Sequence, residues 1–249
     1  MQYVALLYDK ESPITLPGTP EFAADLAGYR DFGRRFAAAI LGGAPLEGST
    51  TARTVRSGGG PGDEVLVTDG PFAETAEVLG GWYVLEAATL DEVIDQAREL
   101  PVASRPAGAV EVRPIVQVWE PEKPVERTPG DTRYLAMIYG RETPADIPGT
   151  PEWEAGAAEH GRFTERHAGA LLGGMALHPV GTATTVRVRD GELLVTDGPF
   201  AESAEVLGGF YELRAASWDE AVAVARDVPT NPGGAVELRP IHDLLPPGS

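Results

Sequence analysis

The sequence has no cysteine, few basic residues and no long apolar run. Without cysteine, disulfide bonds and thiol nucleophiles are excluded. The 20 lysines and arginines stand against 38 aspartates and glutamates, and the formal net charge of −18 disfavours binding to nucleic acid or to an anionic membrane surface. No stretch of about 18 apolar residues occurs, and the first residues, MQYVALLYDKES, reach charge too early for a signal peptide. We therefore expect a cytoplasmic protein without a membrane or nucleic-acid partner.

The chain contains two copies of one pattern. The segment VTDGPFAETAEVLGG at residues 67–81 returns at 195–209 with a single change, Thr75 to Ser203. YVALLY, GTPEF, LGGAPL and GAVEVRPI also return in the same order, as YLAMIY, GTPEW, LGGMAL and GAVELRPI. Length differences between the copies fall in Gly- and Pro-rich stretches, as expected for surface loops. The sequence predicts one repeat at 1–119, an extended linker at 120–131 and a second repeat at 132–249.

Each copy shows the same order of predicted elements. A short apolar strand precedes a threonine-proline-glutamate sequence at Thr19 and Thr150, which is typical of a helix start. The apolar stripe that follows predicts a long helix, which ends near Gly42-Gly43 in the first copy. Alternating segments then predict a hairpin, formed by 51–56 with 64–69 and by 182–187 with 192–197. After the hairpin, each copy ends with a strand, a capped helix and a last strand.

The order β, α, β-hairpin, β, α, β predicts an α+β fold of two ferredoxin-like (βαββαβ) repeats. In such a repeat an antiparallel sheet carries two helices on one face and leaves the other face apolar and uncovered. A second copy on the same chain is the obvious cover. We therefore expect an intramolecular pseudo-dimer that resembles a dimeric α/β-barrel, with any ligand cavity between the repeats. The outer sheet edges leave a further homodimer open.

The segment VTDGPFAE, at 67–74 and 195–202, resembles the DGPF branch of the YCII-related family. The hallmark of that branch is D-G-P-F-A-E-[TS]-K-E between a strand and a Gly-Gly strand, and the resemblance covers nearly the whole chain twice. It implies dimeric α/β-barrel proteins of mostly unassigned activity, some encoded beside extracytoplasmic-function sigma factors. The wider superfamily includes a dehydrochlorinase and implies a His–Asp pair. Ala76 and Ala204 replace the family lysine, so both copies lack that cation.

The DGPF segments allow two interpretations. Asp, Gly, Pro and Phe in succession form a good turn, which would make each segment a hinge between the hairpin and the next strand. Alternatively, Asp69 and Asp197, with Glu74 and Glu202, present carboxylates at a pocket mouth, and the two aspartates act as general bases. These oxygens come from one short segment whose spacing matches no ion loop, so no metal site is predicted.

All four histidines belong to the second copy. His160 and His167 take the places of Tyr29 and Phe36 on the apolar helix stripe, so both are expected to face protein. In one interpretation they are hydrogen-bonded core residues. In the other, His160 forms a proton-transfer dyad with Asp197, of the kind that the resemblance implies, and His167 contacts the ligand.

Arginines and tyrosines supply the remaining candidates. Arg53 and Arg187 lie in the predicted hairpins, where outward salt bridges are the default, but an inward guanidinium would suit a ligand carboxylate. Tyr8 and Tyr139 end the first strands and could donate hydroxyls to the same ligand or simply rim the core. No nucleotide-binding motif is present, and no cofactor is expected.

Two functions follow from these features. The first is a small-molecule-binding or regulatory module for a small carboxylate or phenolic ligand, linked through the resemblance to sigma-factor-type regulation. The second is a cofactor-independent enzyme that performs His–Asp proton transfer or elimination on a small organic substrate. The first copy lacks histidine and both copies lack the family lysine, which favours the binding module.

Overall fold

The computed structural model describes residues 1–56, 65–73, 75–125, 128–201 and 203–243. Within these ranges each repeat contributes six strands and two α-helices. In the first repeat they are β1 (Gln2–Asp9), α1 (Pro20–Arg35), β2 (Ile40–Pro45), β3 (Arg53–Arg56), β4 (Leu66–Asp69), β5 (Val78–Glu86), α2 (Leu90–Ala97) and β6 (Ala109–Trp119). In the second repeat they are β7 (Thr132–Gly140), α3 (Pro151–Arg166), β8 (Leu171–Leu177), β9 (Thr184–Arg189), β10 (Glu192–Asp197), β11 (Val206–Ala215), α4 (Trp218–Arg226) and β12 (Ala235–Pro240).

The two long helices begin where the sequence predicts. The Thr19 hydroxyl accepts a hydrogen bond from the Phe22 N–H, and the Thr150 hydroxyl accepts one from the Trp153 N–H, both at 3.1 Å. These bonds satisfy N–H groups that the first helical turn leaves without partners. Proline follows each cap, where its missing N–H costs no helical hydrogen bond.

The predicted end of the first helix is wrong. The helix α1 stops at Arg35, and the Gly-Gly pair belongs to strand β2. Gly43 has a φ of 145°, and a Cβ at this position would clash with the Trp82 carbonyl oxygen on β5. Only glycine allows the two backbones to approach so closely, so the pair forms a bulged strand and not a helix cap.

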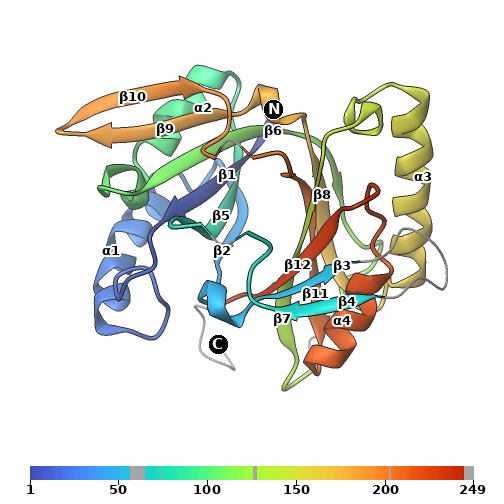
Figure 1. Cartoon of the computed structure of the whole chain (residues 1–249). Helices are drawn as coiled ribbons and strands as arrows, with labels where there is room; N and C mark the ends of the chain where they lie inside the picture. The colour runs from blue at the N-terminus through green and yellow to red at the C-terminus, as the bar shows by residue number, and fades with distance from the viewer. Residues whose placement is uncertain (57–64, 74, 126–127, 202, 244–249) are drawn as a thin grey trace.

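The strands of each repeat form an antiparallel sheet that is extended by a hairpin from the other repeat. The first sheet runs β2-β5-β1-β6 and continues with β9 and β10 of the second repeat, while the second runs β8-β11-β7-β12 and continues with β3 and β4 of the first (Figure 1). Val186 lies opposite Val110 on β6, and Val55 opposite Val236 on β12. The prediction that each hairpin belongs to its own repeat is therefore wrong, because each completes the core beneath the other repeat's helices.

A third core lies between the two sheets. Val4, Leu6 and Trp82 of the first repeat pack with Leu135, Met137 and Phe210 of the second. The rings of Trp82 and Phe210 lie 5.7 Å apart at a steep angle. Each such side chain contributes about 1.5–3 kcal/mol when fully buried, so apolar contact between the sheets stabilises the pairing of the repeats.

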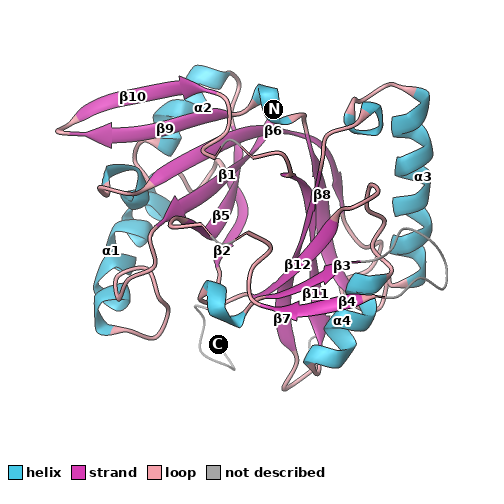
Figure 2. Cartoon of the chain, viewed as in Figure 1, coloured by secondary structure: helices cyan, strands magenta, loops and turns pink. Residues whose placement is uncertain are grey.

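The two sheets join into one curled antiparallel sheet, a half-barrel of mixed α+β class. Strand β6 is the link: its first part pairs with β1 and β9, and its last residues pair with β8, where Trp119 lies opposite Gly174. Figure 2 shows the four α-helices on the outside of the strands. None of the helices in the described ranges has the length and apolar character needed to span a bilayer.

Candidate functional site

The DGPF segments tie each exchanged hairpin to the repeat that it joins. Gly70 and Gly198 turn the chain with φ of 101° and 99°. The Phe72 N–H then donates to Oε2 of Glu237 at 2.9 Å, and the Phe200 N–H donates to Oε2 of Glu111 at 3.0 Å. We call these two contacts the latches. The geometry thus matches the turn interpretation of the DGPF segments, with the added role of joining the repeats.

Stacked aromatic rings accompany the latches. Phe72 stacks on Tyr139 at 4.8 Å and Phe200 stacks on Tyr8 at 4.9 Å, and in each pair the rings come from different repeats. The Arg187 guanidinium lies over the Phe200 ring of this second stack, 5.2 Å from the ring centre. Burial, and then the nearby latch glutamates, raise the pKa of both tyrosine hydroxyls. They therefore remain protonated hydrogen-bond donors at neutral pH.

Each latch glutamate belongs to a buried ion pair. Glu111 pairs with Arg113 and Glu237 with Arg239, and each of the four side chains is only 3% exposed. Each arginine also donates to a backbone carbonyl on β11 or β5 of the opposite repeat. Removal of one partner would leave a buried charge uncompensated. The two glutamates and two arginines therefore have a structural role at the interface between the repeats.

The two aspartates of the predicted carboxylate cluster are exposed at the ends of β4 and β10. Asp69 is 92% exposed and lies 3.4 Å from Arg53 across the hairpin. Asp197 occupies the corresponding place at the end of β10 and is also exposed. Glu74 and Glu202 lie outside the described residues. The two aspartates therefore face solvent at the ends of the exchanged hairpins.

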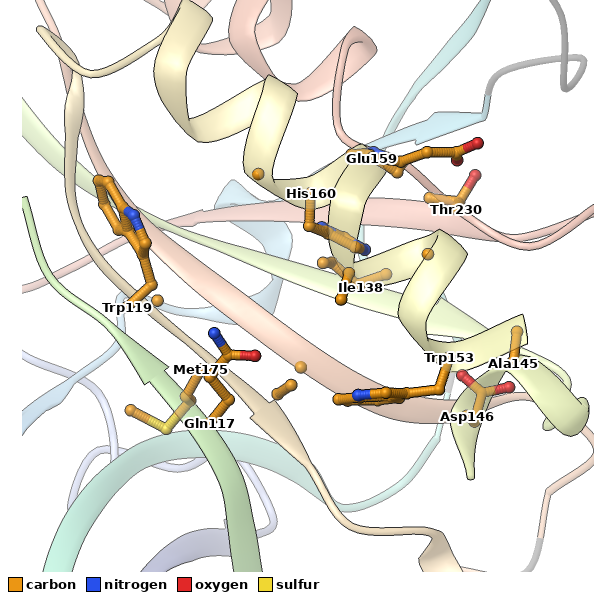
Figure 3. Close-up of a pocket in the computed structure, with 18 of the residues that line it drawn as sticks. Gln117, Trp119, Ile138, Ala145, Asp146, Trp153, Glu159, His160, Met175 and Thr230 are labelled. Carbon is orange, nitrogen blue, oxygen red and sulfur yellow. The ribbon is translucent and has the colours of Figure 1, made fainter. Parts of the chain in front are cut away.

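A cavity of about 220 Å³ lies between α3 and the sheet of the second repeat. We call it the His160 cavity. Figure 3 shows His160 and Trp153 from α3, with Trp119 and Gln117 from β6, around the same space, while the Glu159 carboxylate points away from it. Aromatic, aliphatic and amide groups thus form most of the wall.

The polar centre of this cavity is a hydrogen bond of 3.0 Å between His160 Nδ1 and the Tyr211 hydroxyl. Burial lowers the pKa of His160 below its usual 6.5, against a smaller opposing effect of Glu159. Burial also raises the pKa of Tyr211. The two groups therefore form a neutral pair at neutral pH. The predicted partner Asp197 lies on the exchanged hairpin, so the observed partner of His160 is Tyr211.

The same location in the first repeat is largely filled, with only about 80 Å³ left. Arg105 there makes ion pairs with Asp9, at 3.1 Å, and with Asp25. Tyr29 takes the place of His160, and burial raises its pKa too.

Smaller residues stand at the matching positions of the second repeat. Gly140 and Gly156 replace Asp9 and Asp25, and Asn231 replaces the arginine. Each exchange removes side-chain volume or charge, so the cavity of the second copy is the larger one.

The remaining predicted site residues separate into two groups. Tyr8, Tyr139 and Arg187 line a second cavity between the repeats. His167 instead ends α3 and contacts Asp227 at 2.9 Å, and Arg53 lies over the Trp218 ring at 4.7 Å. Both of these contacts are on the outer, helix side of the molecule, so they fix packing there.

Sequence reasoning missed Tyr211, Trp119 and Trp153. Trp153 had a usable signal, because the otherwise matching GTPEF and GTPEW segments differ at this residue. Trp119 had none, since it closes the first repeat and reaches the second repeat's cavity only because β6 crosses into that sheet. The described residues hold no cluster of three or more His, Asp or Glu side chains suited to a metal ion.

Comparison with known proteins agrees with the duplication. An uncharacterized protein of Rhizobium meliloti (strain 1021), R00369, is 38% identical over 117 residues, which are 46% of this chain and 92% of the relative. The relative thus has about the length of one repeat. A model of the YCII-related domain matches residues 1–119 and again residues 132–245. With two copies of this domain across nearly its whole length, the chain belongs to the YCII-related family.

Proposed function

We propose that this protein binds a compact, uncharged aromatic molecule, such as a phenol, in the His160 cavity. The observation that carries the proposal is the contrast between the repeats: the same location is open in one copy and closed by an Arg–Asp cluster in the other. The cavity volume of about 220 Å³ is below that of drug-sized pockets, so the ligand is small.

The wall chemistry supports an uncharged ligand. Among the described residues that line the cavity there is no lysine or arginine. A carboxylate would therefore lose its hydration without gaining a counter-ion. The indole rings of Trp119 and Trp153 offer flat apolar surfaces, and the neutral His160–Tyr211 pair offers a hydrogen-bond partner for a ligand hydroxyl.

We also propose that the chain is a tandem member of the DGPF branch with two ferredoxin-like repeats. The duplicated DGPFAE segment and the strand order β2-β5-β1-β6 with two helices support this assignment. In the sigma-factor-linked regulation that the resemblance implies, the His160 cavity would serve as the ligand sensor.

The His160–Tyr211 hydrogen bond favours one alternative function, proton transfer. A neutral imidazole whose Nδ1–H donates to the Tyr211 oxygen has a basic Nε2 that can accept a proton from a bound ligand. Such activity would exchange a proton on the α-carbon of a bound ketone for deuterium from heavy water, through removal of the proton and reprotonation from solvent, and His160→Phe would stop it. Ligand recovered without deuterium would leave binding as the function.

The direct test is calorimetric titration of phenol into the intact protein. We expect binding that is lost in Gly156→Leu, because a Cβ at this position meets no atom within 4 Å and the larger side chain would enter the cavity. Gly33→Leu, on the helix of the first repeat and also without a close contact, is the matched control and should bind normally. Equal phenol affinity in both variants, or no binding to the parent, would refute the proposal.

A further inference from the structure

A separate cavity of about 530 Å³ lies between the two repeats. We call it the seam cavity. Both DGPF segments, both latch glutamates and their arginines contribute to its wall. Among the described residues, none lines both this cavity and the His160 cavity.

Two guanidinium groups of β9 face the seam cavity. Val186 and Val188 of this strand pack into the helix-side core, so the alternation of a strand directs Arg187 and Arg189 to the opposite face. Arg189 donates to the backbone carbonyls of Ala103, Val188, Pro106 and Gly108. In the part of the chain that the structure describes, neither arginine makes an ion pair, and the contact of Arg187 is the Phe200 ring.

The other charges of this cavity are already compensated. Arg113 and Arg239 are paired with the latch glutamates. Two further lining carboxylates are near outward cations, Glu77 at 3.7 Å from Lys10 and Glu205 at 3.9 Å from Arg141. The uncompensated charge along the described wall is therefore the positive charge of the two β9 arginines, in a chain whose formal net charge is −18.

A stack of two aromatic rings adjoins these cations. Phe200 and Tyr8 form a parallel stack beside Arg187, and the Tyr8 hydroxyl remains a donor at neutral pH. A guanidinium binds a carboxylate through two parallel N–H groups, and the apolar edges of the stacked rings would contact a planar carbon skeleton.

We propose that the seam cavity is a second ligand site, which binds a small planar carboxylate with Arg187 as its principal anion contact. The site goes beyond the proposed phenol-binding function and does not depend on it. It uses both repeats at once, since Arg187 comes from the second and Tyr8 from the first. A ligand bound in the seam cavity would contact both repeats next to the latches.

The probe for this site is benzoate, titrated calorimetrically into the intact protein. We expect binding that weakens by about tenfold or more in Arg187→Gln and partly recovers in Arg187→Lys, which keeps the charge but loses the two-pronged geometry. Arg56→Gln is the matched control: Arg56 holds the same position in the first repeat, 4.9 Å from the Phe72 ring, and is absent from the described cavity wall. Its benzoate affinity should stay within about twofold of the parent.

Three results would overturn the proposal. They are no heat of binding at about 10 mM benzoate, equal affinity in Arg187→Gln and the parent, and loss of benzoate binding in Gly156→Leu, which would place the carboxylate in the His160 cavity. Phenol binding in Arg187→Gln reports on the proposed function separately. It should be unchanged, so failure of either site is visible without the other.

Discussion

The Phe72 backbone N–H donates a 2.9 Å hydrogen bond to Glu237 Oε2, although the two residues are 165 positions apart. The Phe200 N–H and Glu111 repeat the contact in the opposite sense. A segment that looks like a local turn is thus also a tie between repeats. The segment occurs twice because each repeat sends its hairpin to the other repeat, and each exchanged hairpin has one such contact.

The latch glutamates should be important for stability. Glu237→Ala removes the partner of Arg239 and of the Phe72 N–H at a site that is 3% exposed, so we expect a loss of about 3–5 kcal/mol in the free energy of unfolding. Glu111→Ala should cost a similar amount. Urea denaturation measures both changes. Glu77→Ala, next to the exposed Lys10, is the control and should change stability by less than about 1 kcal/mol.

The exchanged hairpins should keep the two halves together after the chain is cut. We expect a protein with a protease site inserted between residues 120 and 125 to elute at its uncut size after complete cleavage, because each half still contributes two strands to the other's sheet. Size-exclusion chromatography under native conditions tests this, and separation of the halves would contradict the exchange.

Arg105 should be needed to close the first repeat. Its side chain is 15% exposed and lies between Asp9 and Asp25, so Arg105→Asn would leave two partly buried carboxylates without their cation. We expect a destabilisation of about 3 kcal/mol or more by chemical denaturation. The matched change in the second repeat, Asn231→Ala, removes hydrogen bonds to Asp146 and to the Arg141 carbonyl but no ion pair, and should cost about 1 kcal/mol.

His160 should make stability depend on pH. Burial lowers the pKa of the folded imidazole below its usual 6.5, so between the folded and unfolded pKa values the unfolded state binds more protons. Stability from this residue is fully present above pH 6.5 and is lost as the pH falls toward the folded pKa. We expect the melting temperature of His160→Phe to depend less on pH over this range than that of the parent. An unchanged pH profile in that variant would mean that His160 is not the responsible group.

The sequence alone determined the duplication, the helix starts and the strand character of most segments. Thr19 and Thr150 cap their helices because this signal depends only on neighbouring residues. The repeat itself predicted that two like halves would cover each other, and Trp82 and Phe210 do meet between the sheets. Even the difference between the copies was visible, because His160 stands where the first copy has Tyr29.

Tertiary structure alone decided which residues meet. Glycine at 43 reads as a helix end in sequence, but its role depends on the backbone of β5, which passes too close for a side chain. The exchange of hairpins was equally hidden, since Val55 would satisfy the apolar pattern of either sheet. For the same reason His160 has Tyr211 as its partner instead of Asp197. Local patterns fix which face of an element is apolar, whereas the choice of partner depends on contacts between residues far apart in the chain.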